Sequence, residues 1–130
     1  MKKIIIFGRG GQARVVLDCI KLMKGCRAIG FISDKNYSHL FSKQIKYLGA
    51  IKDLNKVIKN HNAKNLFGVI AIGDNSKRKK ISLKIEKLNK NFKWANIIHP
   101  SAIISPSAII GFGNMILARS IISAGTKICN

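Results

Sequence analysis

The stretch "IHPSAIISPSAIIGFGNMILARSIISAGTKICN" at residues 98–130 repeats with a period of six. Isoleucine holds one position of the repeat, at Ile98, Ile104, Ile110, Ile116, Ile122 and Ile128. Four residues after each of the first five stands a small or short side chain: Ala102, Ala108, Asn114, Ser120 and Thr126. This period is typical of a parallel β-helix, in which the isoleucine points inward and the small residue lets the chain turn a corner. Three six-residue sides make a coil of about 18 residues, so the stretch predicts fewer than two coils.

Coils of this kind bury their faces against neighbouring coils, and about three repeats are needed for stability. An uncapped parallel edge is also exposed to pairing with other chains. We therefore expect the chain to be the front part of a longer protein.

The residues before the repeats alternate strand and helix signals. Strands are predicted at 4–7, 28–33, 66–73 and 92–98, helices at 11–24, 53–61 and 74–90, and an irregular loop with at most one helical turn at 35–49. Asp53 is expected to cap the middle helix, and Ile81, Ile85 and Leu88 to form the buried stripe of the last one. This alternation predicts an α/β fold with an open parallel sheet, whose ligands bind beyond the carboxyl ends of the strands.

The glycine-rich stretch "GRGGQARVVLD" at residues 8–18 follows the first of these strands. It allows three interpretations: a nucleotide-sugar site, a dinucleotide site or a purely structural tight turn. The dinucleotide interpretation rests on Gly8, Gly10 and Ala13, which satisfy the pattern G-x-G-x-x-G/A, with Asp34 at about the expected distance.

The formal net charge of +19 invites a nucleic-acid-binding interpretation. However, the lysines are spread almost evenly, and only "KRKK" at 77–80 forms a block. Aromatic residues are not interleaved with the basic ones, as a single-strand stacking platform requires. Solvated lysine faces are therefore the favoured explanation, and no specific nucleic-acid partner is predicted. Attraction to a phosphate-bearing small molecule remains compatible with the charge.

The apolar runs and the cysteines further limit the class of protein. No apolar run approaches the roughly 18 residues of a membrane span, and the apolar run at 4–7 is too short for a signal-peptide core, which predicts a cytoplasmic protein. Cys19, Cys26 and Cys129 fit no disulfide framework or metal-ligand spacing, so free thiols and no metal site are expected.

Five ordered segments, together with the hexapeptide period, resemble one family closely. These segments are "IIIFGRGGQARVVLD", "AIGFISD", "YLGAIKDL", "VIAIGDNSKRKKI" and "IIHPSAIISPSAIIGFGNMI". The chain is similar to the sugar O- and N-acetyltransferases that join a small nucleotide-sugar-binding domain to a left-handed β-helix. Among them are sialic acid O-acetyltransferases and acetyltransferases acting on UDP-4-amino sugars.

The resemblance implies a small Rossmann-like parallel sheet that binds a nucleotide-sugar at residues 1–96. The first, incomplete coils of a left-handed β-helix would follow at 97–130. By position in the family's motifs, it also implies a set of residues that hold the sugar-nucleotide acceptor. They are Gly10, Gly11, Gln12, Ser33, Asp34, Gly73, Asp74 and Asn75. Gln12 stands where the family usually has histidine, and glutamine offers a donor and an acceptor but cannot change its charge.

The resemblance further implies direct acetyl transfer from acetyl-CoA, with a histidine of a later β-helix coil as general base. In the family this histidine lies beyond residue 130, as does most of the acetyl-CoA groove. None of His39, His61 and His99 stands at its position, so no catalytic residue is assigned here and His99 is expected to be a structural turn residue. We expect the chain alone to bind a nucleotide-sugar without transferring acetyl groups. Complete β-helices of the family form homotrimers, and whether this chain does so stays open.

Overall fold

The computed structural model describes residues 1–35 and 39–130, and of His39 and Leu40 it describes the backbone only. Part of the irregular loop predicted at 35–49 therefore lies outside the described residues. A four-stranded parallel sheet forms the first part of the molecule, in the order β3-β2-β1-β4. Its strands are β1 (Lys2–Phe7), β2 (Cys26–Ile32), β3 (Tyr47–Gly49) and β4 (Leu66–Ile70). The predicted α/β parallel sheet is confirmed.

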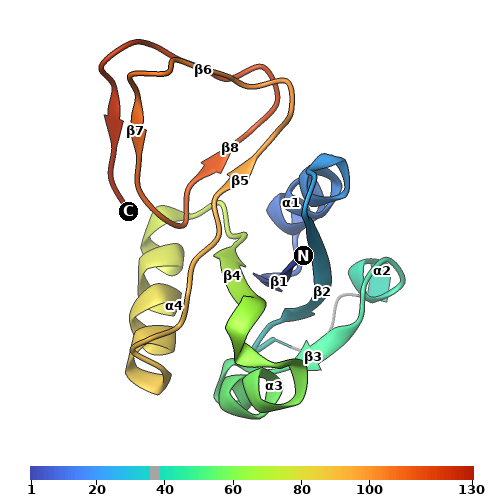
Figure 1. The fold of residues 1–130 in the computed structure, drawn as a ribbon. Coiled ribbons are helices and arrows are strands. Elements are labelled where there is room, and N and C mark those ends of the chain that lie inside the picture. Colours follow the sequence, from blue (N-terminus) through green and yellow to red (C-terminus); the bar gives the residue numbers. More distant parts are fainter. Residues whose placement is uncertain (36–38) are drawn as a thin grey trace.

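Helices cover both faces of this sheet (Figure 1). Their bounds are α1 (Gly11–Leu22), α2 (His39–Ser42), α3 (Leu54–His61) and α4 (Asn75–Leu88), with short 3₁₀ turns η1 (Ile51–Asp53) and η2 (Ala63–Asn65). The central strand β1 alternates between two cores. Ile4 and Ile6 pack with α1, whereas Ile5 and Phe7 pack with α3 and α4. This two-sided burial explains why β1 is apolar at every position from Ile4 to Phe7.

Six short strands wind into coils of a parallel β-helix, the orange and red triangle of Figure 1. They are β5 (Ile97–Ile98), β6 (Ile103–Ile104), β7 (Ile109–Ile110), β8 (Met115–Ile116), β9 (Ile121–Ile122) and β10 (Lys127–Ile128). Each of the first three pairs in parallel with the strand 18 residues later, as in Ile97 with Met115. The β-helix expected from the hexapeptide period is confirmed.

The isoleucines of the repeat face the interior of these coils, as predicted. Ile116 and Ile122 are buried, and the other four are half-buried. Three isoleucines that directly precede repeat positions point outward, with Ile103 64%, Ile109 62% and Ile121 71% exposed, whereas Ile97 is buried in the core beneath α1. Side chains also join the coils, since the Arg119 amide donates to Ser101 Oγ at 3.1 Å.

The strand predicted at 92–98 is wrong. Around Trp94 the chain makes a single bridge to the edge of the sheet, with the Ala95 amide donating to the Gly68 carbonyl at 2.9 Å. Phe92 packs into the space left by Gly68, where a Cβ would lie 2.5 Å from its ring. The chain then leaves the sheet, because the Ile97 amide donates to the Asn114 carbonyl within the β-helix.

Other expectations need smaller corrections. The strand predicted at 66–73 ends at Ile70, and β3 was missed because its pairing with β2 is a long-range contact. Asp53 does not cap α3, since its carboxylate accepts instead from the Ala50 amide at 2.9 Å. Leu88 is 36% exposed and does not complete the buried stripe of α4, whereas Ile85 is fully buried.

Candidate functional site

A crevice of about 520 Å³ opens where the carboxyl ends of β1, β2 and β4 meet. The segments that follow these strands, at residues 8–12, 33–35 and 71–73, form its rim, and one side of α4 closes it. Ligands of open parallel sheets bind at this edge, because the strand ends and the helix N-termini converge there.

The glycines of the loop after β1 differ in the space around their Cβ positions. Gly8 has a φ of +129°, and a Cβ there would lie 2.6 Å from the Ala71 carbonyl oxygen, so the loop crosses the end of β4 at very short range. Gly10 and Gly11 have open space at the Cβ position. Gly10 precedes the first turn of α1, which has neither a side-chain cap nor an acidic residue. The first amides of a helix lack partners within the helix, so this turn offers free donors to the crevice.

Six of the eight residues expected at the site line this crevice: Gly10, Gly11, Gln12, Ser33, Asp34 and Gly73. Asp74 and Asn75 lie outside its lining. The Asp74 carboxylate accepts from the Lys77 amide at 2.8 Å and so caps α4. Asn75 accepts from Arg78 and lines a neighbouring cavity. Both side chains are turned toward their own helix, as is usual at a helix N-terminus.

Asp34 is fully engaged within the chain. One carboxylate oxygen accepts from the Ile51 amide at 2.8 Å, and the other accepts from the Lys84 ammonium at 2.5 Å. Partial burial raises the pKa of this carboxyl, but the hydrogen bonds from Lys84 and Ile51 outweigh burial and hold the pKa below its usual range. Asp34 therefore ties the end of β2 to η1 and α4, through one hydrogen bond to each of its carboxylate oxygens.

Gln12 connects the glycine loop to the β-helix. Its side-chain amide lies 3.9 Å from the Met115 sulfur on β8, within the range of a weak hydrogen bond to sulfur. The expected substrate-binding glutamine therefore stands at the junction of the sheet and the first coils.

Sequence reasoning missed the cationic character of the crevice. Among the described residues, its lining holds four basic side chains, Arg9, Lys35, Lys77 and Lys80, and one carboxylate, that of Asp34. Lys77 and Lys80 are the ends of the "KRKK" block, and their spacing places both on one side of α4. The block itself was the signal, but only the packing of α4 shows that two of its members face a cavity.

An apolar floor completes the crevice. It consists of Phe7, Ile32, Ile51, Ala71, Ile72 and Ile81. An apolar surface with amide donors and cations at its edge suits a ligand that combines a flat organic ring with phosphate groups.

Other candidate residues have structural explanations. The His99 ring nitrogen Nδ1 accepts from the Ser101 amide at 3.0 Å, which agrees with its expected place in a turn. Cys19, Cys26 and Cys129 are free thiols. Within residues 1–35 and 39–130, no group of His, Cys, Asp and Glu could hold a metal ion. No helix among these residues is long and apolar enough to cross a membrane.

A parallel sheet with a glycine-loop crevice, continued directly by β-helix coils, defines a class of two-part proteins that join an α/β domain to a β-helix. The model of the PglD N-terminal domain matches residues 3–85, and the chain belongs to this family.

Curated and solved relatives agree with that assignment. UDP-N-acetylbacillosamine N-acetyltransferase of Bacillus subtilis is 33% identical over 121 residues, which cover 91% of this chain and 52% of the relative. The acetyltransferase domain of PglB from Neisseria gonorrhoeae, solved with acetyl coenzyme A, has a TM-score of 0.80 at 26% identity and covers 99% of this chain. PerB from Caulobacter crescentus, solved with CoA and GDP-perosamine, has a TM-score of 0.80 at 28% identity and covers all of it.

The chain spans between about half and three fifths of the length of these relatives, at 52%, 59% and 58%. The resemblance to sugar acetyltransferases with a β-helix is thereby confirmed.

Proposed function

We propose that this chain is the nucleotide-sugar-binding part of an acetyl-CoA-dependent sugar N-acetyltransferase. The observation that carries the proposal is the crevice itself, which combines open glycine positions, two lysines on one side of α4 and an apolar floor. The names of the relatives support transfer to nitrogen and a nucleoside diphosphate sugar as acceptor.

Within this proposal, the residues of the crevice have distinct tasks. Gly10 and Gly11 let the phosphates approach the first amides of α1, and Lys77 and Lys80 balance the phosphate charge. Ser33 and Gly73 form walls of the site, Gln12 positions the glycine loop against the β-helix, and Asp34 holds the crevice walls together. Asp74 and Asn75 act through the start of α4 rather than by direct contact.

In the same proposal, the β-helix serves the binding of acetyl-CoA and the transfer of the acetyl group. By the family resemblance, the β-helix would contribute to the acetyl-CoA groove, carry the general base on a later coil, and assemble as a homotrimer. We place the protein in the cytoplasm, since acetyl-CoA and nucleotide-sugars are metabolites of that compartment.

Calorimetric titration of the chain with UDP, GDP, CMP and NADH tests the proposal. We expect a nucleoside diphosphate to bind more tightly than CMP or NADH. Tight NADH binding without nucleoside diphosphate binding would favour the dinucleotide interpretation.

A charge-matched pair of double variants locates the phosphates. Lys77→Gln with Lys80→Gln removes two charges from the crevice, and we expect roughly tenfold weaker binding. Lys56→Gln with Lys59→Gln removes two exposed charges at the same spacing on α3, outside the crevice, and should leave the affinity unchanged. An equal loss in both would mean that only the overall charge attracts the nucleotide.

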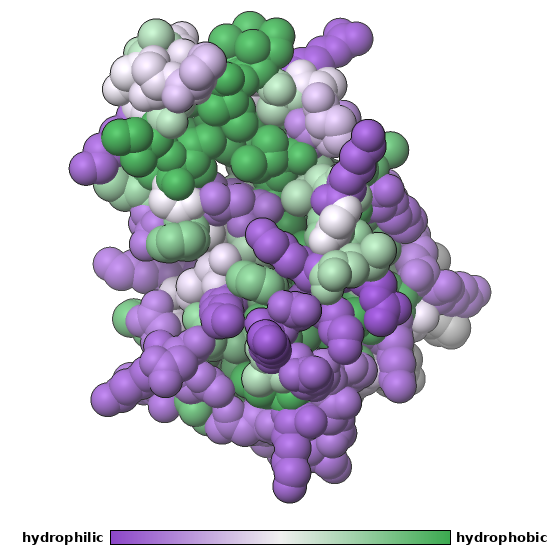
Figure 2. All heavy atoms as spheres, in the orientation of Figure 1, coloured by the Kyte–Doolittle hydropathy of each residue, from purple (hydrophilic) through white to green (hydrophobic). Residues whose placement is uncertain are grey.

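The nucleic-acid alternative makes a different prediction. It requires steeply salt-dependent binding to any duplex. In Figure 2 the hydrophilic residues are spread over the face below the β-helix coils, with apolar residues between them. We therefore expect only weak, non-specific binding to duplex DNA.

A further inference from the structure

Four segments meet where the strands of the sheet begin, at the edge opposite the nucleotide crevice. The Lys2 amide donates to the Gly25 carbonyl at 2.9 Å, and the Lys3 ammonium donates to the His61 carbonyl at 3.0 Å. The ends of α1, α3 and α4 therefore gather around the start of β1 and β4. We call this surface the amino-terminal edge; it consists of residues 1–3, 22–27, 61–65 and 88–93.

The amino-terminal edge is strongly basic. Its segments contain seven of the 24 lysine and arginine residues of the chain and none of the five acidic residues. Lys3 is half-buried and the other six are exposed: Lys2, Lys24, Arg27, Lys64, Lys90 and Lys93. Between described residues the ion pairs are those of Lys21 with Asp18 and of Lys84 with Asp34. None of the seven basic residues therefore takes part in an ion pair within the described chain.

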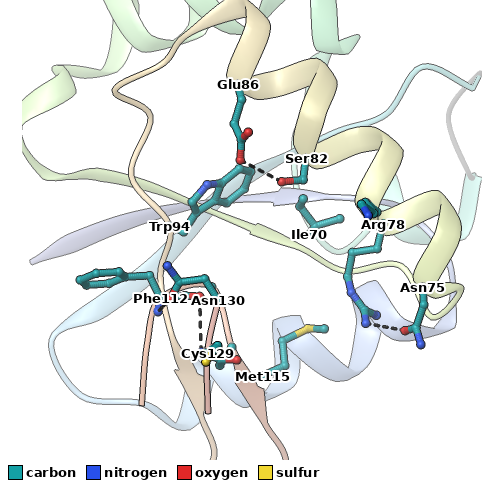
Figure 3. Close-up of a pocket in the computed structure, with 13 residues that line it drawn as sticks. Ile70, Asn75, Arg78, Ser82, Glu86, Trp94, Phe112, Met115, Cys129 and Asn130 are labelled. Atoms are coloured by element: carbon teal, nitrogen blue, oxygen red, sulfur yellow. Dashed lines mark hydrogen bonds between the residues drawn. The ribbon is translucent and has the colours of Figure 1, made fainter. Parts of the chain in front are cut away.

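The five carboxylates of the sequence are engaged elsewhere. Asp18 pairs with Lys21 on α1. Glu86 accepts from the Ser82 hydroxyl at 3.2 Å and lines the cavity between α4 and the β-helix coils, as Figure 3 shows. The remaining three accept from backbone amides that follow the carboxyl ends of the strands: Asp34, Asp53 and Asp74. The positive charge of the amino-terminal edge is therefore left for a partner.

Two ammonium groups of this edge are held at one aromatic ring. The Nζ atoms of Lys2 and Lys93 lie 5.3 and 5.8 Å from the centre of the Phe67 ring, within the range of a cation–π contact. A helix C-terminus attracts basic residues by itself, but neither of these lysines belongs to a helix. Because like charges this close repel each other, an anionic group beside them lowers the electrostatic energy.

A pocket of about 410 Å³ opens next to Lys93. Lys64, Asn89 and Asn91 also line it, above an apolar base that includes Leu66 and Phe92. The Asn89 side chain donates to Asn55 Oδ1 at 3.2 Å and accepts from the Asn91 amide at 3.2 Å, which fixes this wall. Ammonium groups and amides around one pocket are suited to a phosphate group.

Exposed apolar side chains stand among the basic ones. Met1 is 74% exposed, and Leu22 and Leu88, the last residues of α1 and α4, are 58% and 36% exposed. Such side chains gain no burial from a free phosphate. They do gain it in the interface of a bilayer, whose anionic head groups attract the neighbouring lysines at the same time. This combination favours a lipid surface over a soluble polyanion.

We propose that the amino-terminal edge docks on a membrane surface that contains anionic phospholipids. Its basic side chains face the lipid phosphates, the pocket beside Lys93 receives one head group, and Leu22 and Leu88 enter the interface. The contact is peripheral, and it leaves the nucleotide crevice on the side of the sheet that faces away from the membrane. The inference goes beyond the proposed function and does not depend on it.

Co-sedimentation of the whole chain with vesicles tests the proposal at physiological ionic strength. The probes are vesicles of phosphatidylcholine alone and vesicles in which about one third of it is replaced by phosphatidylglycerol, an anionic lipid. We expect the chain to bind the anionic vesicles and not the neutral ones. Lys2→Gln with Lys93→Gln should weaken this binding at least about tenfold, because each basic residue at the surface adds to the attraction.

The matched control lies at the opposite edge of the sheet. Lys77→Gln with Lys80→Gln removes two exposed charges from the crevice and should leave vesicle binding within about twofold of the wild type, because charges this far from the lipid are screened. In calorimetric titrations with UDP and GDP, the two double variants should exchange their effects. An equal loss of vesicle binding in both would mean that only the overall charge attracts the chain, and the proposal would be wrong.

The apolar part of the contact has its own matched pair. Leu22→Ser should weaken vesicle binding by about threefold or more, since it removes the side chain that enters the interface. Leu83→Ser changes a leucine on α4 that is 50% exposed and lies outside the amino-terminal edge, and it should have no effect. Unchanged binding in Leu22→Ser, together with tight binding of duplex DNA that Lys2→Gln with Lys93→Gln abolishes, would assign the edge to nucleic acid instead.

Two cysteines report the orientation of the bound chain. Cys26 is half-buried and pairs with Lys2 at the amino-terminal edge, whereas Cys129 is exposed on the β-helix. We expect anionic vesicles to slow alkylation of Cys26 severalfold and to leave the rate at Cys129 unchanged. Protection of Cys129 alone would overturn the proposed orientation. Failure to bind anionic vesicles would overturn the membrane proposal and leave the proposed function intact, because nucleotide binding is measured separately.

Discussion

The two kinds of glycine in the loop after β1 lead to opposite predictions for the same substitution. Gly8 combines a positive φ with a backbone oxygen 2.6 Å from the place of a Cβ, so alanine there meets both strain and a clash. Gly11 begins α1, and its Cβ position is open, although the residue lines the crevice. Gly8→Ala should therefore damage the fold, whereas Gly11→Ala should damage ligand binding alone.

The magnitudes follow from these surroundings. For Gly8→Ala, the left-handed backbone costs about 1–2 kcal/mol, and forcing a methyl group against the fixed Ala71 carbonyl costs about 1–3 kcal/mol more. At roughly 3–5 °C per kcal/mol for a chain of this size, Tm should fall by at least about 6 °C. Gly11→Ala should keep or raise the free energy of unfolding, by up to about 1 kcal/mol, because alanine favours the helix.

Thermal unfolding followed by circular dichroism and calorimetric titration with UDP and GDP measure the two effects separately. The added methyl group of Gly11→Ala takes space that a phosphate would occupy, so we expect at least about tenfold weaker binding, or 1.4 kcal/mol. Wild-type affinity in Gly11→Ala would refute the glycine loop as a ligand surface. An unchanged Tm in Gly8→Ala would refute the argument from close approach.

Three further predictions concern packing and charge. Gly68→Ala would place a methyl group 2.5 Å from an aromatic ring atom and should lower the free energy of unfolding by about 1–3 kcal/mol, measured by urea denaturation. In the β-helix, Ile122→Ala should cost about 2–4 kcal/mol and Ile121→Ala less than about 0.5 kcal/mol by the same measurement, and equal costs would contradict the inward phase of the repeat. Because Asp34 has a lowered pKa, the stability that it contributes is present above its ordinary pKa of 3.8 and is lost as the pH falls through the lower folded-state value. Lys84→Gln should raise the pKa of Asp34 in an NMR titration of the carboxyl carbon, and an unmoved pKa would exclude the ion pair.

Local sequence patterns predict much of the architecture. The inward phase of the isoleucine repeat can be read without any long-range information, because each six-residue side of a β-helix buries the same position. The apolar run of β1, its glycine loop and the helix that follows are likewise neighbours in the chain. For the same reason, the residues directly after β1 and β2 can be expected at the carboxyl ends of these strands, where the crevice opens.

Contacts between elements that are distant in sequence could not be predicted, and only the tertiary structure shows them. The residues around Trp94 have the composition of a strand. However, Phe92 packs into the space beside Gly68, and the residues from Ile97 onward pair within the β-helix instead of the sheet. Two lysines of the "KRKK" block, Lys77 and Lys80, line the crevice because α4 packs there. Asp34, an expected ligand contact, also binds two partners that are distant in sequence, the Ile51 amide and Lys84. The cavity between α4 and the β-helix coils cannot be predicted from any single stretch of the sequence. Its two walls come from α4 and from the β-helix, and they form a cavity only when these elements pack side by side.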